Sequence, residues 1–248
     1  MWGDAAVHVV VPAYREERLL PRMLRRVPAF VDRIVVVDDG SDDGTAAAAG
    51  SVADPRIDVV RHLYNRGVGA AIVTGYRRAF ALGASVAVVM AADDQMHPDD
   101  LEALIAPVVR GEADYVKGNR MIHAEVARMP LLRRVAGRAL AFATRRTTGL
   151  SVGDTQCGYT ALAAKAAARL PLESLWPSYG YPNDLLGLLA GRRLRVCEVP
   201  VRPVYADEES GVRPWHVLTI LGVLARRSLL ERSNRCARTA DASKPQGG

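Results

Sequence analysis

The sequence predicts an α/β fold built on an open, mostly parallel sheet with helices on its faces. Short apolar segments expected to form strands, at 7–11, 34–37, 57–61 and 86–90, alternate with segments that carry apolar residues at helical spacing. This alternation predicts parallel strands joined by right-handed crossovers. The chain has 248 residues and is 49% hydrophobic, which is enough for one continuous core. We therefore expect one domain at 1–235.

The individual elements follow from local pattern. Helices are expected between the strands at 16–26, 46–49, 69–82 and 98–109, the first on the spacing of Leu19, Leu20, Met23 and Leu24. The regular alternation then loosens. The later elements expected are a short strand at 115–117, a basic amphipathic helix at 131–147, turn-forming residues at 149–159, helices at 165–170 and 184–190, and a strand at 195–200. An amphipathic helix is expected at 215–232 and a disordered tail at 236–248.

Composition narrows the class of partner. The net charge is +6 and comes almost wholly from arginine, because the only lysines are Lys117, Lys165 and Lys244. Arginine suits phosphate groups and an anionic membrane surface. No basic stripe interleaved with aromatic residues occurs, so nucleic acid is not an expected partner. The sequence does not indicate an oligomeric state.

The cysteines and the hydropathy of the chain indicate a cellular compartment. The three cysteines lack metal-ligand spacing, which favours a reducing compartment. The first residues lack the pattern of a signal peptide, and the apolar run at 217–225 is much shorter than the roughly 20 residues that span a bilayer. We expect a cytoplasmic protein that meets any lipid at the inner face of the membrane.

Two strands are followed at once by carboxylates. Asp38 and Asp39 follow the strand at 34–37, and Asp93 and Asp94 follow the strand at 86–90. In an open parallel sheet, ligands bind beyond the carboxyl ends of the strands. Mg²⁺ or Mn²⁺ sits readily between carboxylates and the phosphates of a substrate. The pattern predicts a site for a metal ion and a diphosphate.

A series of motifs in order along the chain narrows this further: VVVPAYREE at 9–17, VVDDGSDDGT at 36–45, NRGVGAA at 65–71, DDQMHP at 93–98, KGNR at 117–120, DTQCGY at 154–159 and VPV at 199–201. The run resembles the family 2 glycosyltransferases, and the later segments resemble their dolichol- and polyprenyl-phosphate branch. The resemblance covers roughly residues 7–213. It implies the GT-A fold, a Rossmann-like nucleotide-diphospho-sugar transferase fold, with a nucleotide-binding half at 7–120 and an acceptor half at 121–215.

The resemblance implies nucleotide-sugar contacts in several loops, at Pro12, Tyr14, Glu16, Asp38, Asp39, Arg66, Gly67, Asp93 and Arg213. Asp39 matches the family's base-binding aspartate. Asp93 and Gln95 match metal-contacting residues of the family's Asp-x-Asp-x-Gln motif, in which Ala91 stands where the first aspartate would be. The loss of one acid weakens or broadens metal binding without abolishing it. Glu16 and Gly67 also have structural explanations. An acid stabilises the first turn of a helix, and a glycine suits the loop that enters a helix.

On the acceptor side, Arg120 and Arg138 match phosphate-binding arginines. Asp154 and Asp184 match catalytic carboxylates of the family. Asp184 is open to three roles, as a general base, an arginine partner or a helix cap. A hydroxyl acceptor needs a base, whereas an ionised phosphate does not.

The resulting hypothesis is a metal-dependent, inverting glycosyltransferase that moves a hexose from a UDP- or GDP-linked sugar to polyprenyl phosphate at a membrane surface. One alternative is the same transfer to a soluble hydroxyl acceptor with Asp184 as base. Others are a nucleotide-sugar-binding module without catalysis, which Ala91 makes conceivable, and a nucleotidyltransferase, whose Rossmann-like sheet also carries acidic metal loops.

Overall fold

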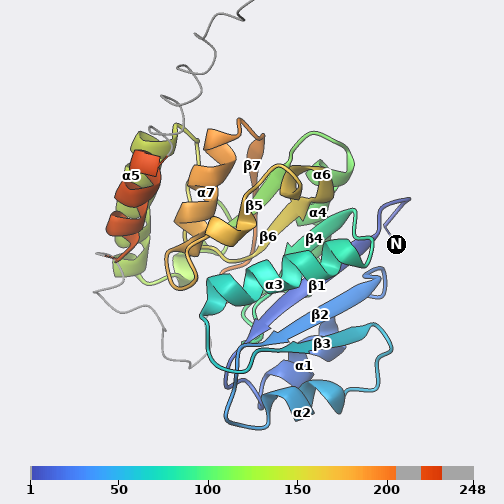
Figure 1. The fold of residues 1–248 in the computed structure, drawn as a ribbon. Coiled ribbons are helices and arrows are strands. Elements are labelled where there is room, and N and C mark those ends of the chain that lie inside the picture. The colour runs from blue at the N-terminus through green and yellow to red at the C-terminus, as the bar shows by residue number, and fades with distance from the viewer. Residues whose placement is uncertain (1, 205–218, 231–248) are drawn as a thin grey trace, which may run out of the picture.

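The computed structural model describes residues 2–204 and 219–230 and contains one seven-stranded sheet in the order β3-β2-β1-β4-β6-β5-β7 (Figure 1). The strands are β1 Val7–Ala13, β2 Arg33–Asp38, β3 Ile57–Arg61, β4 Val86–Val89, β5 Tyr115–Asn119, β6 Thr160–Ala163 and β7 Val196–Pro200. Among these strands, β6 is antiparallel to its neighbours β4 and β5, and the other pairs are parallel. The expected mixed, mostly parallel sheet is confirmed.

Helices flank the sheet, with α3 and α7 over the face turned to the viewer in Figure 1. The helices are α1 Leu20–Arg26, α2 Thr45–Gly50, α3 Val68–Ala81, α4 Leu101–Val109, α5 Leu131–Thr148, α6 Ala164–Ala167 and α7 Tyr181–Gly191. α1 begins later than the sequence predicts, because residues 17–19 form a turn, and before it the Glu16 N–H donates to Thr45 Oγ1 at 2.9 Å. Among the described residues, no helix is both long enough and apolar enough to cross a bilayer.

Strand β6 is absent from the sequence prediction. Its four residues include two alanines, which are poor strand formers, so local propensity gives little signal. Its place is decided by pairing on both sides, with Thr160 opposite both Val89 of β4 and Lys117 of β5. Because β6 runs antiparallel, the loop before it arrives at the carboxyl ends of β4 and β5.

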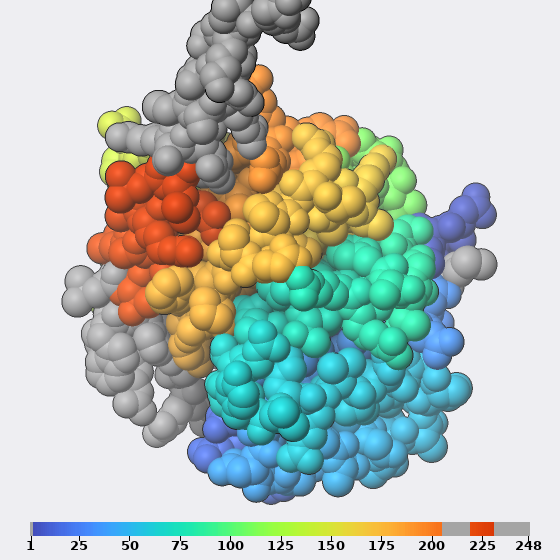
Figure 2. All heavy atoms as spheres, viewed as in Figure 1, coloured from blue at the N-terminus to red at the C-terminus, as the bar shows by residue number. Residues whose placement is uncertain are grey.

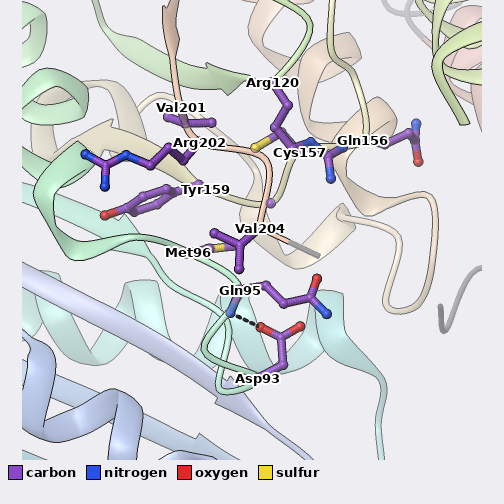
Figure 3. Close-up of a pocket in the computed structure, with 11 residues that line it drawn as sticks. Asp93, Gln95, Met96, Arg120, Gln156, Cys157, Tyr159, Val201, Arg202 and Val204 are labelled. Atoms are coloured by element: carbon purple, nitrogen blue, oxygen red, sulfur yellow. Dashed lines mark hydrogen bonds between the residues drawn. The ribbon is translucent and has the colours of Figure 1, made fainter. Parts of the chain in front are cut away.

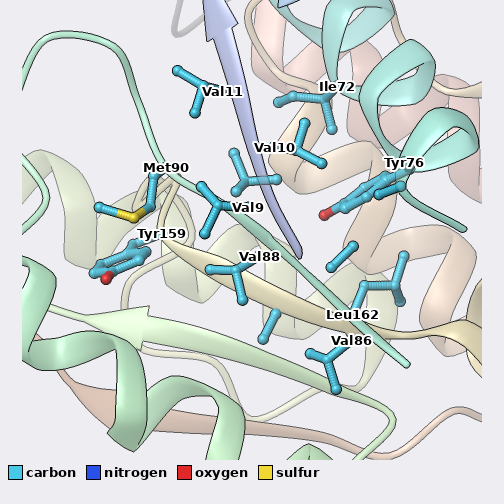
Figure 4. Close-up of a cluster of buried hydrophobic side chains, with 14 of the residues drawn as sticks. Val9, Val10, Val11, Ile72, Tyr76, Val86, Val88, Met90, Tyr159 and Leu162 are labelled. Carbon is cyan, nitrogen blue, oxygen red and sulfur yellow. The ribbon is translucent and has the colours of Figure 1, made fainter. Parts of the chain in front are cut away.

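The main core lies between the sheet and its helices and contains residues from both halves of the chain. Figure 4 shows its centre, where Val10 of β1 lies beside Ile72 and Tyr76 of α3, and Val9 of β1 lies beside Val88 of β4 on the other face of the sheet. Gly75 lets α3 approach β1 closely, because a Cβ there would lie 2.1 Å from Val10 Cγ1. This contact fixes α3 against the strand β1, which pairs with both β2 and β4.

A second, smaller cluster joins α5 to the helical segment at 219–230. Leu140 of α5 packs with Ile220 and Leu224 of this segment. The two helices lie side by side in Figure 1, and Figure 2 shows the segment at the surface in red. Positions 215–218, 231–232 and 236–248 of the predicted C-terminal helix and tail lie outside the described residues.

Candidate functional site

A cavity of about 180 Å³ opens at the carboxyl edge of the sheet, beyond β4, β5 and β7. Its lining comes from the loops after these strands and from the loop that precedes β6. Figure 3 shows these residues: Asp93, Gln95, Met96, Arg120, Gln156, Cys157, Gly158, Tyr159, Val201, Arg202 and Val204. The cavity therefore unites Asp93, Gln95 and Arg120, three residues that the sequence predicts for the site.

The β4–α4 loop presents Asp93 and Gln95 to the cavity. Asp93 Oδ1 accepts a hydrogen bond from the Gln95 N–H at 3.0 Å, drawn as a dashed line in Figure 3. The Ala91 N–H lies 3.1 Å from Met96 Sδ and donates to it. These two contacts close the loop into a tight turn and bring the carboxylate and the amide to one side of it.

Asp94 points the other way. Its side chain is 2% exposed, and its carboxylate lies 2.6 Å from both Arg22 and Arg26 of α1. The sequence assigns Asp94 to a spacer position and gives no role to these two arginines. Their spacing of four residues, which places them on one face of a helix, is the only signal in the sequence.

The oxygen atoms of Asp93 and Gln95 in the cavity suit a hard divalent cation. Among the described residues, no group of three or more histidines, cysteines or acids is arranged to enclose a metal. Asp93 and Gln95 instead supply one carboxylate and one amide. Mg²⁺ and Mn²⁺ suit such a partial site, because hard cations accept oxygen ligands and Mg²⁺ commonly keeps waters and binds substrate phosphates.

Arg120 lines the cavity and is held by Asp154. Arg120 Nε and Nη2 donate to the two Asp154 oxygens at 2.7 and 3.1 Å, and the backbone N–H groups of Gln156 and Cys157 also donate to this carboxylate. Burial by itself would raise the pKa of Asp154, but Arg120 and Lys117 hold it below its ordinary value. Asp154 thus remains charged and joins the β5 end to the loop before β6.

Lys117 and Glu198 support the same loop and are missed as site residues by the sequence prediction. Lys117 is fully buried and donates to the Cys157 carbonyl, and burial lowers its pKa. Glu198 accepts hydrogen bonds from the N–H groups of Gly153 and Asp154 at 2.8 and 3.0 Å. Their roles arise from the adjacency of β5 and β7 to this loop, which the sequence does not reveal.

The structure gives Asp184 an arginine partner, one of the three roles left open for it. It is fully buried on α7 and does not line the cavity. Both of its oxygens lie 2.7 Å from the Arg227 guanidinium, and the Trp176 N–H donates to it at 2.8 Å. A carboxylate enclosed in this way is an arginine partner that ties α7 to the segment at 219–230. Of the three roles predicted for Asp184, this arrangement favours the arginine partner over the general base.

Arg138 is also placed elsewhere. It is exposed on α5 and is not among the residues that line the cavity. The prediction that Arg120 and Arg138 hold one phosphate together is not supported by their positions here. The direction of α5, which the sequence does not show, decides where Arg138 points.

The carboxyl end of β2 carries Asp38 and Asp39, both buried. Asp39 accepts hydrogen bonds from the Arg66 and Gly67 N–H groups at 3.0 and 2.7 Å and lies 2.6 Å from His62 Nδ1. Asp39 therefore organises the loop before α3. Asp38 Oδ1 accepts from the Ser41 N–H at 3.0 Å. Asp38 Oδ2 lies 3.1 Å from Arg61 Nε, but no described group donates a well-directed hydrogen bond to it.

The glycine-rich loop before α3 packs against the loop that contains Pro177. Gly67 has φ 95°, and a Cβ there would lie 2.4 Å from the Pro177 carbonyl oxygen. The Ala70 N–H donates to that same oxygen at 3.1 Å. Protein backbone thus occupies the start of α3, and the Arg66 side chain is exposed. The glycine permits close packing between two loops.

The remaining nucleotide-site candidates lie at the end of β1, which pairs with both β2 and β4. Pro12 is half-buried and Tyr14 is 40% exposed, with the Arg15 guanidinium 5.3 Å from the Tyr14 ring centre. These positions and Glu16 share the sheet edge with the cavity, although they do not line it. Arg213 lies outside the described residues.

Comparisons with known proteins agree with this architecture. The family model described as glycosyl transferase family 2 matches residues 8–168. A UDP-N-acetylglucosamine–dolichyl-phosphate N-acetylglucosaminyltransferase of Methanococcus voltae is 29% identical, over 83% of this chain and 88% of the relative. A polyprenol monophosphomannose synthase of Mycolicibacterium smegmatis is 32% identical, over 82% of this chain and 78% of the relative.

A solved structure supports the fold. Glucosyl-3-phosphoglycerate synthase from Mycobacterium tuberculosis, crystallised with Mn²⁺, UDP-glucose and phosphoglyceric acid, superposes with a TM-score of 0.70 at 23% identity. The match covers 91% of this chain and 80% of that one. The fold is thus that of the GT-A glycosyltransferases. The chain belongs to glycosyl transferase family 2.

Proposed function

We propose that this protein transfers a hexose from a nucleoside-diphosphate sugar to a polyprenyl phosphate, with inversion and with the help of Mg²⁺ or Mn²⁺. The observation that carries the proposal is the meeting of Asp93, Gln95 and Arg120 in one cavity. Asp93 and Gln95 would hold the metal, which stabilises charge that develops on the leaving diphosphate. Arg120 binds the acceptor phosphate, for which the arginine fork is well suited.

The carboxylates of the site favour a phosphate acceptor over a hydroxyl acceptor. A hydroxyl needs a general base within hydrogen-bonding reach. Asp184 pairs with Arg227 away from the cavity, and Asp154 pairs with Arg120. Among the described residues that line the cavity, Asp93 is the one carboxylate, and it is proposed for the metal. A phosphate acceptor is already ionised and attacks without a base. Two relatives whose names specify a lipid phosphate or lipid phosphosugar support the same choice.

The surface of α5 supports contact with a membrane. Between residues 126 and 153 the chain has six arginines and no acid. Leu131, Leu132, Val135 and Phe142 of α5 are 57–80% exposed. A helix that presents apolar side chains among arginines suits the boundary between lipid headgroups and acyl chains, where arginines reach outward to the headgroups. We propose peripheral docking through α5, which would bring the lipid phosphate near the enzyme.

The test is a transfer assay preceded by a ligand panel. Thermal shift with UDP, GDP and dTDP sugars plus Mn²⁺ identifies the donor, because stabilisation grows with the ratio of ligand concentration to dissociation constant. Transfer to undecaprenyl and dolichyl phosphate is then compared with transfer to water-soluble alcohols, with and without EDTA. We expect chelator-sensitive transfer to the lipid phosphates. Transfer only to soluble alcohols would refute the proposed acceptor, and tight donor binding without turnover would refute catalysis.

A further inference from the structure

The loop that presents Asp93 and Gln95 is held to helix α1 on the side away from the cavity, through Asp94. Asp94, between them in sequence, has φ 57°, a left-handed backbone conformation uncommon for a residue with a side chain. This conformation lets Asp94 project away from the cavity while its two neighbours line it. Such a conformation persists where the surrounding structure fixes it.

The anchor is a pair of arginines on α1. Arg22 Nε and Arg26 Nη1 each lie 2.6 Å from a different oxygen of the Asp94 carboxylate. The carboxylate is 2% exposed, whereas Arg22 and Arg26 are 67% and 36% exposed. Both oxygens of a buried carboxylate are therefore neutralised by residues of one helix, and the carboxylate holds the loop to that helix.

Through α1, Asp94 is also connected to the loop after β1. α1 follows the end of β1, where Tyr14 and Glu16 belong to the predicted nucleotide loop, and Leu20, Met23 and Leu24 bury one face of the helix in the core. The contact with Asp94 thus links the loop after β1 to the loop after β4. Ala91 stands in place of the first aspartate of the family motif, and Asp94 points away from the cavity. Asp93 is therefore the one carboxylate that this loop presents to the cavity, so the placement of Asp93 and Gln95 matters more.

We propose that Asp94, held by Arg22 and Arg26, is a positioning residue that fixes the orientation of Asp93 and Gln95 toward the metal ion. The inference rests on the proposed function, because it assumes that these two residues contact a metal. Groups that orient metal ligands typically contribute about 10- to 100-fold to metal affinity.

The test measures Mn²⁺ binding directly, by the electron paramagnetic resonance signal of free Mn²⁺, alone and with UDP or GDP. Asp94→Asn is the first variant, because asparagine matches the shape of aspartate and tolerates the left-handed conformation. We expect its dissociation constant for Mn²⁺ to rise about 10- to 100-fold. Arg22→Gln and Arg26→Gln remove one ion pair each without changing the loop, and we expect each to raise the dissociation constant by a smaller factor. They keep the test available if Asp94→Asn folds poorly.

The matched control is Asp114→Asn. Asp114 is also a largely buried carboxylate that binds an exposed arginine, Arg195, but it precedes β5 at the opposite edge of the sheet. We expect this variant to bind Mn²⁺ as the wild type does. Unchanged Mn²⁺ affinity in Asp94→Asn, with only a lower melting temperature, would overturn the positioning role. A wild type that binds no Mn²⁺ with either nucleotide would instead overturn the proposed metal chemistry itself.

Discussion

Arg120 and Asp154 form an ion pair in which Nε and Nη2 of the arginine lie 2.7 and 3.1 Å from the two carboxylate oxygens. Asp154 also accepts from the Arg120 backbone N–H at 3.2 Å, so it fixes the residue at both its main chain and its side chain. The fully buried carboxylate sets the direction of a guanidinium at the cavity. This geometry indicates that Asp154 orients Arg120, the residue proposed to bind the acceptor phosphate.

Asp154→Asn should therefore impair use of the acceptor. We expect kcat/KM for polyprenyl phosphate to fall about 100-fold, because a misplacement near 1 Å has an effect of this size. The loss should appear chiefly in the KM for the acceptor, with donor binding retained. Steady-state kinetics and the donor thermal shift measure the two effects. A loss confined to kcat would instead indicate that Asp154 acts on the reacting atoms.

The same ion pair predicts how stability depends on pH. Burial opposes the charged form of Asp154, yet Arg120 and Lys117 hold its pKa below the ordinary 3.8. The unfolded chain thus takes up a proton at a higher pH than the folded protein does. The stabilisation is fully present above about pH 5 and is lost as the pH falls through the lower pKa of the folded state. In urea unfolding between pH 3 and 6, Asp154→Asn should show a shallower loss of stability toward acid than the wild type.

Substitution of Asp184 tests whether this residue has a structural or a catalytic role. Asp184→Asn leaves the Arg227 charge buried without its partner, and we expect a loss of about 3–5 kcal/mol in the free energy of unfolding. The double variant Asp184→Leu/Arg227→Met should recover part of this loss. Activity per folded molecule, assayed well below the melting temperature, should stay within a few-fold of wild type. A stable but inactive Asp184→Asn would restore the general-base hypothesis.

The apolar side chains on α5 should determine membrane binding. Leu132→Ser and Phe142→Ser should each weaken flotation with anionic vesicles about tenfold, because burial of such a side chain contributes roughly 1.5–3 kcal/mol. Leu63→Ser is the control, since Leu63 is 100% exposed but lies between β3 and α3. Equal flotation of all three variants would show that α5 is not the docking surface.

The contact between α3 and β1 predicts a packing effect. Gly75→Ala places a methyl group 2.1 Å from Val10 Cγ1, and we expect a loss of about 1–3 kcal/mol from overpacking. Gly50→Ala on α2 is the matched control, because no atom lies within 4 Å of its added Cβ. Thermal unfolding compares the two, and equal stability would show that α3 shifts at little cost.

Much of the structure of residues 7–120 could be predicted because its signals are local. The strands β1 to β4 are apolar runs bounded by turn residues, and the helices between them show their own periodicity. Asp93 and Gln95 follow a strand directly, so the topology of a parallel sheet is enough to place them at its ligand-binding edge. Arg120 likewise follows the end of β5.

The sequence by itself thus determined the fold class, the family and the edge of the sheet where the site lies. Only the tertiary structure decided which charged groups pair with one another. Asp94 binds Arg22 and Arg26, Asp184 binds Arg227, and Asp39 holds the loop before α3. Each carboxylate is 27 to 72 residues from these partners in the sequence, and no periodic pattern links it to them. A buried carboxylate must pair with hydrogen-bond donors that lie next to it in the folded protein. Its role therefore depends on tertiary packing, which a short sequence motif does not specify.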